Sequence, residues 1–268
     1  MLKKWSKNLQ RRHPKFMLIL SLAKNDFKSK YASSQLGIFW AFFRPVVMAC
    51  VYIFVFSIVA RGAAVGSEYP YAFWLLPGLI VWFVFSDGLS SSVGALQEYS
   101  FLVKNVCFDI SILPFVKVIS AFIIHSFFTL LIFALYLVWG LPIKPEILQL
   151  PYYYAATFCF TLVLARIVST CQPFFKDLSM AIEIVLLVGI WACPIMWDIG
   201  MLPEKYAVFF KLNPLYHLVQ GYRMSFMGGG WFWETPVQTL GFWLLTGALS
   251  LAGRRMFKRL SAHFADVI

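Results

Sequence analysis

Residues Leu36 to Ala60, LGIFWAFFRPVVMACVYIFVFSIVA, decide the fold class of this chain. A helix of about 20 apolar residues crosses the ~30 Å hydrocarbon layer of a bilayer, because each residue adds about 1.5 Å. This segment is long enough, yet it carries Arg44 and Pro45 inside it. An ionised arginine at that depth costs at least ~2.5 kcal/mol unless it faces protein, water or a ligand. The segment is therefore predicted to be a membrane span, with Arg44 as a functional candidate.

The composition of the whole chain also indicates an integral membrane protein. Of its 268 residues, 60% are hydrophobic and only 13% are charged, whereas soluble domains are about 45–50% apolar. The net charge of +11 does not indicate nucleic-acid binding, because nine of the 23 lysines and arginines precede Tyr31 and four lie between Arg254 and Arg259. Both clusters flank apolar segments, as topology signals do, and no RNA- or DNA-binding motif accompanies them.

Hydropathy predicts an all-α membrane protein with six spans behind a basic leader. The leader comprises residues 1–35, and from Pro14 onward it has the spacing of an amphipathic helix on the inner membrane surface. A solvated N-terminal helix is the alternative. Residues 36–268 form the transmembrane domain. The predicted spans are residues 36–60, 71–96, 115–141, 152–171, 178–197 and 237–252.

Residues 199–234 are too polar for an ordinary span and too hydrophobic for a simple loop. Short apolar pieces are separated by Pro203, by Asn213 and Pro214, and by the glycines at 228–230. Such pieces are tolerated at membrane depth where protein or a water-filled cavity shields them. We expect re-entrant half-helices on the outer face.

The distribution of basic residues predicts the orientation. With both termini inside, 16 of the 23 lysines and arginines lie on cytoplasmic segments and five lie outside, while Arg44 and Arg166 lie within spans. This asymmetry follows the positive-inside rule. The first 35 residues contain no short apolar core of the kind that a cleavable signal peptide needs.

Motifs for catalysis are missing from the sequence. It contains no GxxxxGK phosphate loop, HExxH pair or GxSxG elbow. The five cysteines are scattered without CxxC spacing, so neither a disulfide framework nor a metal site is predicted. We expect no catalytic site and no cofactor in this chain, so any ATP must be handled by another subunit.

Four motifs in order carry a family resemblance. NDFKSKYASSQLG runs into IFWAFFRP at residues 25–45, LQEYSFLVKNVCFDISILP occupies residues 96–114, and FFKD lies at residues 174–177. The series CPIMW, LPEKY, LNPLYHLVQGYR and GGGWFW precedes the last span. Together they resemble the permease subunit of type-2 ABC exporters of bacterial cell-surface polymers, over essentially the whole chain.

Within that group the chain most resembles the wall teichoic acid translocation permeases, on NPLYHLVQGYRMSFMGGGWFW and the ending FKRLSAHFADVI. Related permeases export lipopolysaccharide O-antigen or capsule, which is the second reading. A membrane-embedded transferase acting on polyprenyl phosphates and an ion-coupled carrier are rivals from other classes.

The resemblance implies partners and a location. Two copies of the permease would pair with two ATP-binding subunits, which hold ATP and Mg²⁺, in the bacterial cell membrane. The substrate would be a polyprenyl-diphosphate-linked glycopolymer moved from the inner to the outer face. A coupling helix at about residues 97–105 would rest in a groove of the ATPase, although an ordinary cytoplasmic turn is the alternative. Its contact residues would be Gln97, Glu98, Tyr99, Phe101, Leu102, Lys104 and Asn105.

A diphosphate-linked polymer requires cations and a weakly gripping channel. Arginine offers planar, bidentate donors to phosphate oxygens, and aromatic rings contact the apolar faces of sugars. The candidate cations are Arg44, Arg166, Lys24, Lys28 and Lys30, and the candidate channel aromatics are Trp40, Phe43, Tyr52, Phe73, Trp74 and Trp82. Alternatively, the arginines pair with Glu183 or Asp87 or snorkel to the inner surface, and the aromatics face lipid or core.

Overall fold

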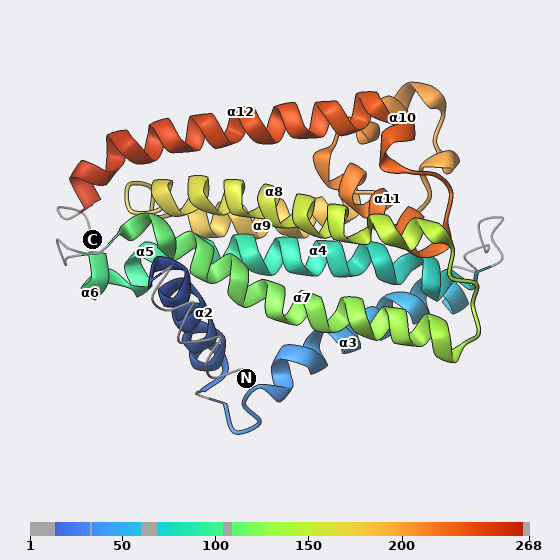
Figure 1. The fold of residues 1–268 in the computed structure, drawn as a ribbon, viewed down its shortest axis with the longest axis horizontal. Coiled ribbons are helices and arrows are strands. Elements are labelled where there is room, and N and C mark those ends of the chain that lie inside the picture. Colours follow the sequence, from blue (N-terminus) through green and yellow to red (C-terminus); the bar gives the residue numbers. More distant parts are fainter. Residues whose placement is uncertain (1–13, 33, 60–68, 104–108, 265–268) are drawn as a thin grey trace.

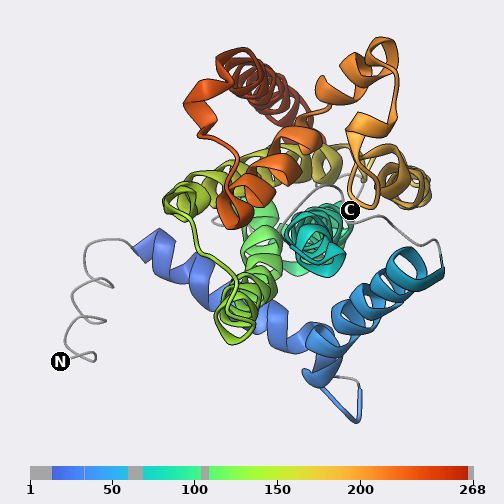
Figure 2. The same cartoon turned by 90° about the vertical axis from the view of Figure 1, so that its right-hand side faces the viewer.

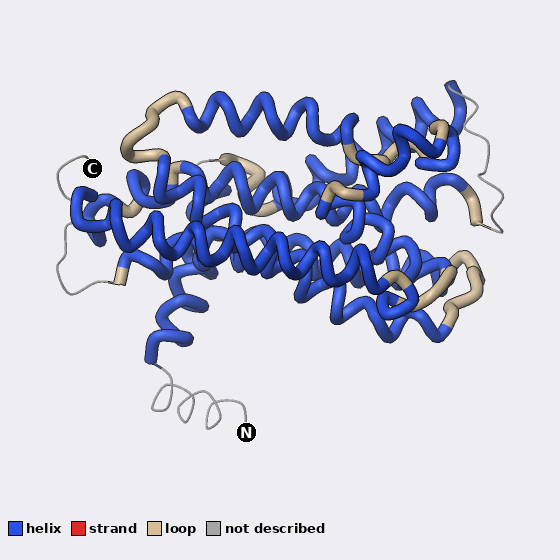
Figure 3. Tube along the Cα trace, turned by 90° about the horizontal axis from the view of Figure 1, so that it is seen from above, coloured by secondary structure: helices blue, strands red, loops and turns tan. Residues whose placement is uncertain are grey.

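The computed structural model describes residues 14–32, 34–59, 69–103 and 109–264, and within these ranges the chain is helical without any strand (Figures 1 and 3). The principal helices are α2 (Pro14–Ala32), α3 (Phe39–Ile53), α4 (Tyr71–Val93), α5 (Ala95–Glu98), α6 (Ser100–Val103), α7 (Leu113–Val138), α8 (Leu150–Cys171), α9 (Leu178–Ala192), α10 (Glu204–Lys211), α11 (Pro214–Met227) and α12 (Pro236–Leu260). A π-helical segment, η1 (Phe54–Val59), continues α3. Short 3-10 turns are η2 (Ile110–Ile112), η3 (Pro145–Gln149), η4 (Ile199–Met201), η5 (Phe232–Glu234) and η6 (Ser261–His263).

Prolines define where several helices begin. A proline lies in the first turn of α7, α8, α11 and α12, where its missing N–H has no intrahelical partner to lose and its fixed φ suits the helix. Asn213 caps α11, because its side chain accepts a hydrogen bond from the backbone N–H of Leu215 at 3.0 Å. The helix ends at three glycines, residues 228–230, whose φ values of 80°, 114° and 118° exclude most other residues. The predicted breaks in residues 199–234 are therefore confirmed, whereas re-entry into the bilayer stays a prediction.

Helix α4 is the centre of the bundle (Figure 2). It packs against α3, α7, α8, α9 and α11. Within the chain, 72% of its most apolar window is buried, compared with 11% for the span that begins with α3. Helix α3 therefore leaves most of its apolar surface for lipid or another protein.

Among the residues that the structure describes, four helical segments are long and apolar enough to cross a bilayer: residues 39–56, 71–93, 110–138 and 145–171. They correspond to the first four predicted spans. Helix α9 is apolar but has only 15 residues. Helix α12 has 25 residues and carries basic side chains in its last turns. The six-span topology thus stays a prediction for these last two helices.

The two ends of the bundle differ in what they carry. Figure 1 shows α5, α6 and the C-terminal end of α12 at one end, with α10 and α11 toward the other. Helix α11 is largely buried against α4 and α8, whereas α10 is largely exposed. Arg223 of α11 is buried and donates to the carbonyl oxygens of Trp74 at 3.2 Å and Pro194 at 2.9 Å. This arginine joins α11 to α4 and to the chain that follows α9.

Candidate transport cavity and coupling segment

A cavity of about 720 Å³ opens between α2, α3, α4, α7 and α9. It exists because α3 stands away from the bundle for most of its length, as its low burial shows. Pro45 lies inside α3 on the cavity wall, and a proline there cannot donate the backbone hydrogen bond that would reach the carbonyl of Ala41. Ala41 lines the same cavity. The wall of the cavity is therefore a helix weakened at the level of Arg44.

Charged groups gather where α2 meets this cavity. Lys30 of α2 forms an ion pair with Asp87 of α4, and both line the cavity together with Arg44 and Tyr31. Burial and the charge of Asp87 raise the pKa of Tyr31 to about 12, although Arg44 acts in the opposite direction. Asp87 is thus already paired with Lys30. Among the described residues, Arg44 forms no ion pair with a carboxylate.

Aromatic and imidazole side chains also line the cavity. Trp40 and Tyr52 come from α3 and Trp82 from α4. His125 of α7 is 2% exposed, and its Nε2 shares a hydrogen bond of 2.7 Å with the hydroxyl of Tyr222. The cavity thus combines one unpaired arginine with aromatic walls.

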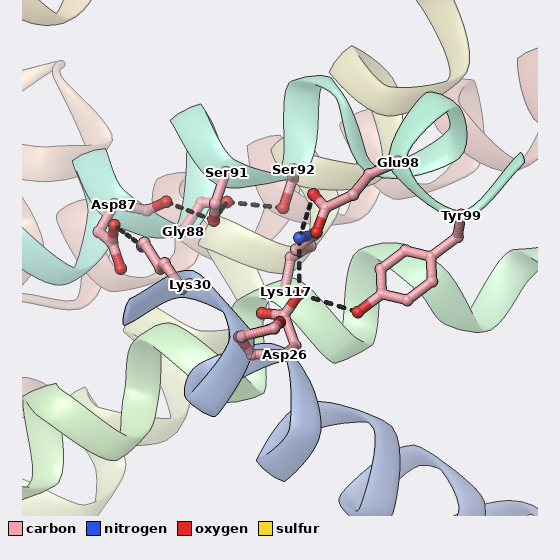
Figure 4. Close-up of polar contacts among 10 residues, drawn as sticks. Asp26, Lys30, Asp87, Gly88, Ser91, Ser92, Glu98, Tyr99 and Lys117 are labelled. Carbon is pink, nitrogen blue, oxygen red and sulfur yellow. Dashed lines mark hydrogen bonds and ion pairs between the residues drawn. The ribbon is translucent and has the colours of Figure 1, made fainter. Parts of the chain in front are cut away.

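A second polar cluster lies at the start of α7, next to the predicted coupling segment (Figure 4). The Lys117 side chain is 6% exposed and donates to Asp26 of α2 at 2.6 Å and to Glu98 of α5 at 2.5 Å. Tyr99 donates to the same Asp26 carboxylate at 2.9 Å. Burial, with the neighbouring Asp26, raises the pKa of Tyr99, so its hydroxyl keeps its proton and donates.

The two clusters are joined through α2. Asp26 and Lys30 are four residues apart and so lie on one face of that helix. Asp26 contacts the coupling segment through Lys117 and Tyr99, and Lys30 contacts Asp87 on the cavity wall. A displacement of residues 95–101 would therefore act on the same helix that pairs with the cavity wall.

The predicted coupling residues fall on two short helices, α5 and α6, instead of one continuous helix. Gln97, Glu98 and Phe101 are exposed, and Tyr99 is half-buried. Lys104 and Asn105 lie outside the described residues, as does the side chain of Leu102. The backbone of the segment thus presents Phe101, which is 69% exposed, to the space beyond the bundle.

The predicted cations do not share one site. Arg44 and Lys30 line the large cavity. Lys24 and Lys28 are exposed on α2 and are not among its lining residues. Arg166 lies against the ring of Phe115 and lines a different cavity, between α8 and α12. The five candidate cations are therefore divided between the large cavity, the exposed surface of α2 and the cavity between α8 and α12.

The predicted aromatics also divide into two groups. Trp40, Tyr52 and Trp82 line the cavity. Phe43 is exposed on α3 beside Trp40, with ring centroids 5.8 Å apart. Phe73 and Trp74 belong to the buried core, where the ring of Trp74 lies 3.5 Å from the guanidinium carbon of Arg223. Phe73 and Trp74 therefore contribute to core packing and do not line the cavity.

Sequence reasoning missed Asp26 and Lys117 as partners. It named Asp87 as a possible partner of Arg44 or Arg166, whereas the structure pairs Asp87 with Lys30. Lys117 stood out only as an ionisable residue near the start of a predicted span, and such residues are functional candidates by default. Asp26 gave no signal beyond its place in an amphipathic helix. Its partner Lys117 lies 91 positions away, a distance that no spacing rule reaches.

Comparison with known proteins identifies the family. Residues 17–227 match the ABC-2 type transporter family. The chain belongs to this family. It is 27% identical over 257 residues to an O-antigen export system permease protein of Klebsiella pneumoniae, covering 94% of this chain and 95% of that protein. An O-antigen export system permease protein of Myxococcus xanthus is 24% identical, covering 78% and 80% of the two chains.

A polysialic acid transport protein of Escherichia coli is 22% identical over 214 residues, covering 78% of this chain and 81% of that protein. The names of these relatives do not support the expectation of wall teichoic acid. ABC-2 permeases are the membrane components of exporters and work with ATP-binding subunits. This permease is therefore a multi-pass membrane protein and a transporter component.

Proposed function

We propose that this ABC-2 permease exports a polyprenyl-diphosphate-linked cell-surface polysaccharide, driven by ATP hydrolysis in partner subunits. The observation that carries the proposal is the cavity of about 720 Å³, where Arg44 lies beside aromatic walls and forms no ion pair with any carboxylate in the part of the chain that the structure describes. A guanidinium group in that position suits a diphosphate, and Trp40, Tyr52 and Trp82 suit sugar rings. The polymer would enter from the inner face, where α2 and the coupling segment lie.

The polymer class follows from the relatives and from the sequence motifs. Relatives that span 94% of this chain are named as O-antigen export permeases, so O-antigen-type polysaccharide is the first candidate. Wall teichoic acid is the second, because residues 213–233 and 257–268 resemble its permeases. The two candidates are distinguished by measuring how each lipid-linked polymer stimulates the ATPase activity of the purified complex. Stimulation by a polysaccharide but not by a polyol-phosphate polymer supports the first candidate. The opposite result supports the second.

The working assembly would be a homodimer bound to two ATP-binding subunits, with six spans per chain and both termini inside. Helix α3 supports this, because its exposed apolar side chains need lipid or a second copy to cover them. Those side chains are Phe39, Trp40, Phe43, Val46, Val47, Met48 and Val51. A partner copy that covered the open side of the cavity would complete a closed path for the polymer.

Substitution of Arg44 tests the proposed substrate contact. Hydrogen bonds to charged groups contribute about 1.5–3 kcal/mol, and ~1.4 kcal/mol corresponds to about tenfold. Arg44→Gln should therefore lower export of lipid-linked polysaccharide in inverted vesicles by about tenfold or more. Arg44→Lys, which keeps the charge but not the planar fork, should retain part of it.

Lys211→Gln provides the matched control, because Lys211 is a cation exposed on α10, away from the cavity. Each variant is first shown to bind the ATPase at the wild-type level. If Arg44→Gln exports the polymer at the wild-type rate, the proposed contact between Arg44 and the substrate is wrong.

A further inference from the structure

A second cavity, of about 90 Å³, lies between α8 and α12 and is independent of the transport cavity. Val163 and Arg166 line it from α8, and Ser250, Gly253, Arg254 and Phe257 line it from α12. Two guanidinium groups from different helices thus face one small space. Nothing in the proposed transport path uses it.

Packing fixes the shape of this cavity. Helices α8 and α12 are in close contact, and a Cβ added at Gly253 would lie 3.0 Å from Cγ1 of Ile167. A side chain at position 253 would require the Ile167 side chain to shift. The guanidinium of Arg166 lies 4.9 Å from the ring centroid of Phe115 on α7, a cation–π contact that orients the group.

The charges in the cavity are unbalanced. Arg166 and Arg254 are close enough to repel each other, and no ion pair joins either to a carboxylate among the described residues. Asp109 attracts Arg166, but its carboxylate accepts hydrogen bonds from the N–H and hydroxyl of Ser111. Like charges converging on a small cavity are stabilised when an anion binds between them.

The position of the cavity indicates which anion. Arg166 lies five residues before Cys171, the end of α8, and Arg254 lies six residues before Leu260, the end of α12. At 1.5 Å per residue, Arg166 and Arg254 lie about 8 and 9 Å from the ends of their helices. The same end of the bundle carries the coupling segment and the basic end of α12 (Figure 1). Basic pockets between helices on the cytoplasmic side bind anionic lipid headgroups.

We propose that Arg166 and Arg254 bind the headgroup phosphate of an anionic phospholipid of the inner leaflet, with the Ser250 hydroxyl as a further donor. Each guanidinium offers paired N–H donors to phosphate oxygens. The lipid would bridge α8 and α12 and hold the last span against the bundle. This assigns Arg166 to a lipid phosphate in place of the diphosphate of the polymer.

Lipid binding by the full permease–ATPase complex tests the proposal. The complex is purified in neutral detergent, titrated with phosphatidylglycerol and measured by native mass spectrometry. Arg166→Gln and Arg254→Gln should each weaken phosphatidylglycerol binding by about tenfold or more, as expected for loss of a charge-assisted contact. Arg255→Gln is the control, because it removes the same charge from the neighbouring position, which does not line the cavity.

Two further arms identify the source of the phosphate. Inorganic phosphate at millimolar concentration and undecaprenyl diphosphate are added as competitors. Failure of both to displace phosphatidylglycerol supports a lipid site, whereas displacement by either overturns it. Wild-type phosphatidylglycerol binding by all three variants also overturns it. Equal loss of phosphatidylglycerol binding in all three variants overturns it too, since that result would show only general charge attraction.

The intact complex of each variant is verified by gel filtration, and Arg254→Gln changes only an exposed residue. Binding is measured without transport, so a negative result here leaves the export proposal standing.

Discussion

At the scale of single residues, Lys117 joins α7 to α2 and α5 at the end of the bundle that carries the predicted coupling segment. It is buried between the carboxylates of Asp26, 4% exposed, and Glu98, 54% exposed. Removing one partner of a buried ion pair leaves an uncompensated charge and costs about 3–5 kcal/mol. Lys117→Met should therefore destabilise the purified permease by about that amount, measured by denaturant-induced unfolding in detergent.

Two companion variants separate this effect from general damage. The double variant Lys117→Met with Asp26→Leu should recover much of the lost stability, because no buried charge is left unpaired. Glu98→Gln should change stability by less than about 1 kcal/mol, since its carboxylate is half exposed. A Lys117→Met permease as stable as the wild type would contradict the cluster.

At this scale the sequence could single out Arg44 but not Asp26, and the proposed contact of Arg44 with substrate stays a prediction. A single arginine in an apolar span is conspicuous in the sequence, and it lies on the cavity wall. Asp26 looks like one more polar residue on an amphipathic helix. Its role depends on Lys117 and Tyr99, which the fold brings to it from 91 and 73 positions away.

At the scale of elements, the predicted coupling segment, α5 and α6, is the proposed contact with the ATPase. Phe101 on α6 is 69% exposed, although a large apolar ring gains by burial. Interface anchors of this kind contribute about 2 kcal/mol or more. Phe101→Ala should weaken binding of the ATPase subunit by about thirtyfold, measured by titration of the purified subunit onto permease in nanodiscs.

The control for this prediction is a ring of the same type at the other end of the bundle. Phe209 on α10 is 70% exposed, so Phe209→Ala removes the same surface without touching α5 or α6. It should leave ATPase binding unchanged. Equal affinities for the wild type and Phe101→Ala would argue against α6 as the contact.

Helix boundaries could be predicted where prolines and glycines define them. The breaks at Pro203, at Asn213 and at the glycines at 228–230 all fall where expected. For the last two predicted spans, the helix bounds differ from the hydropathy limits, because a helix can end within an apolar segment or continue beyond it. Helix α9 ends at Ala192, five residues before the predicted limit, and α12 continues to Leu260, eight residues beyond it.

At the scale of the whole molecule, burial is unevenly distributed among the helices. Helix α4 is enclosed by its neighbours, whereas the span beginning with α3 is only 11% buried and forms a wall of the transport cavity. Composition and hydropathy predicted an all-helical membrane protein correctly. They could not predict this asymmetry, because the hydropathy of an apolar side chain is the same whether lipid, the protein core or a partner covers it.

The central claim is that this permease moves its polymer only with the energy of ATP hydrolysed by its partner. The most direct test is transport of lipid-linked polysaccharide into proteoliposomes containing the permease alone, with the active ATPase, or with an ATPase variant that binds but does not hydrolyse ATP. Transport is expected in the second case only. Transport by the permease alone, with or without an ion gradient, would contradict it.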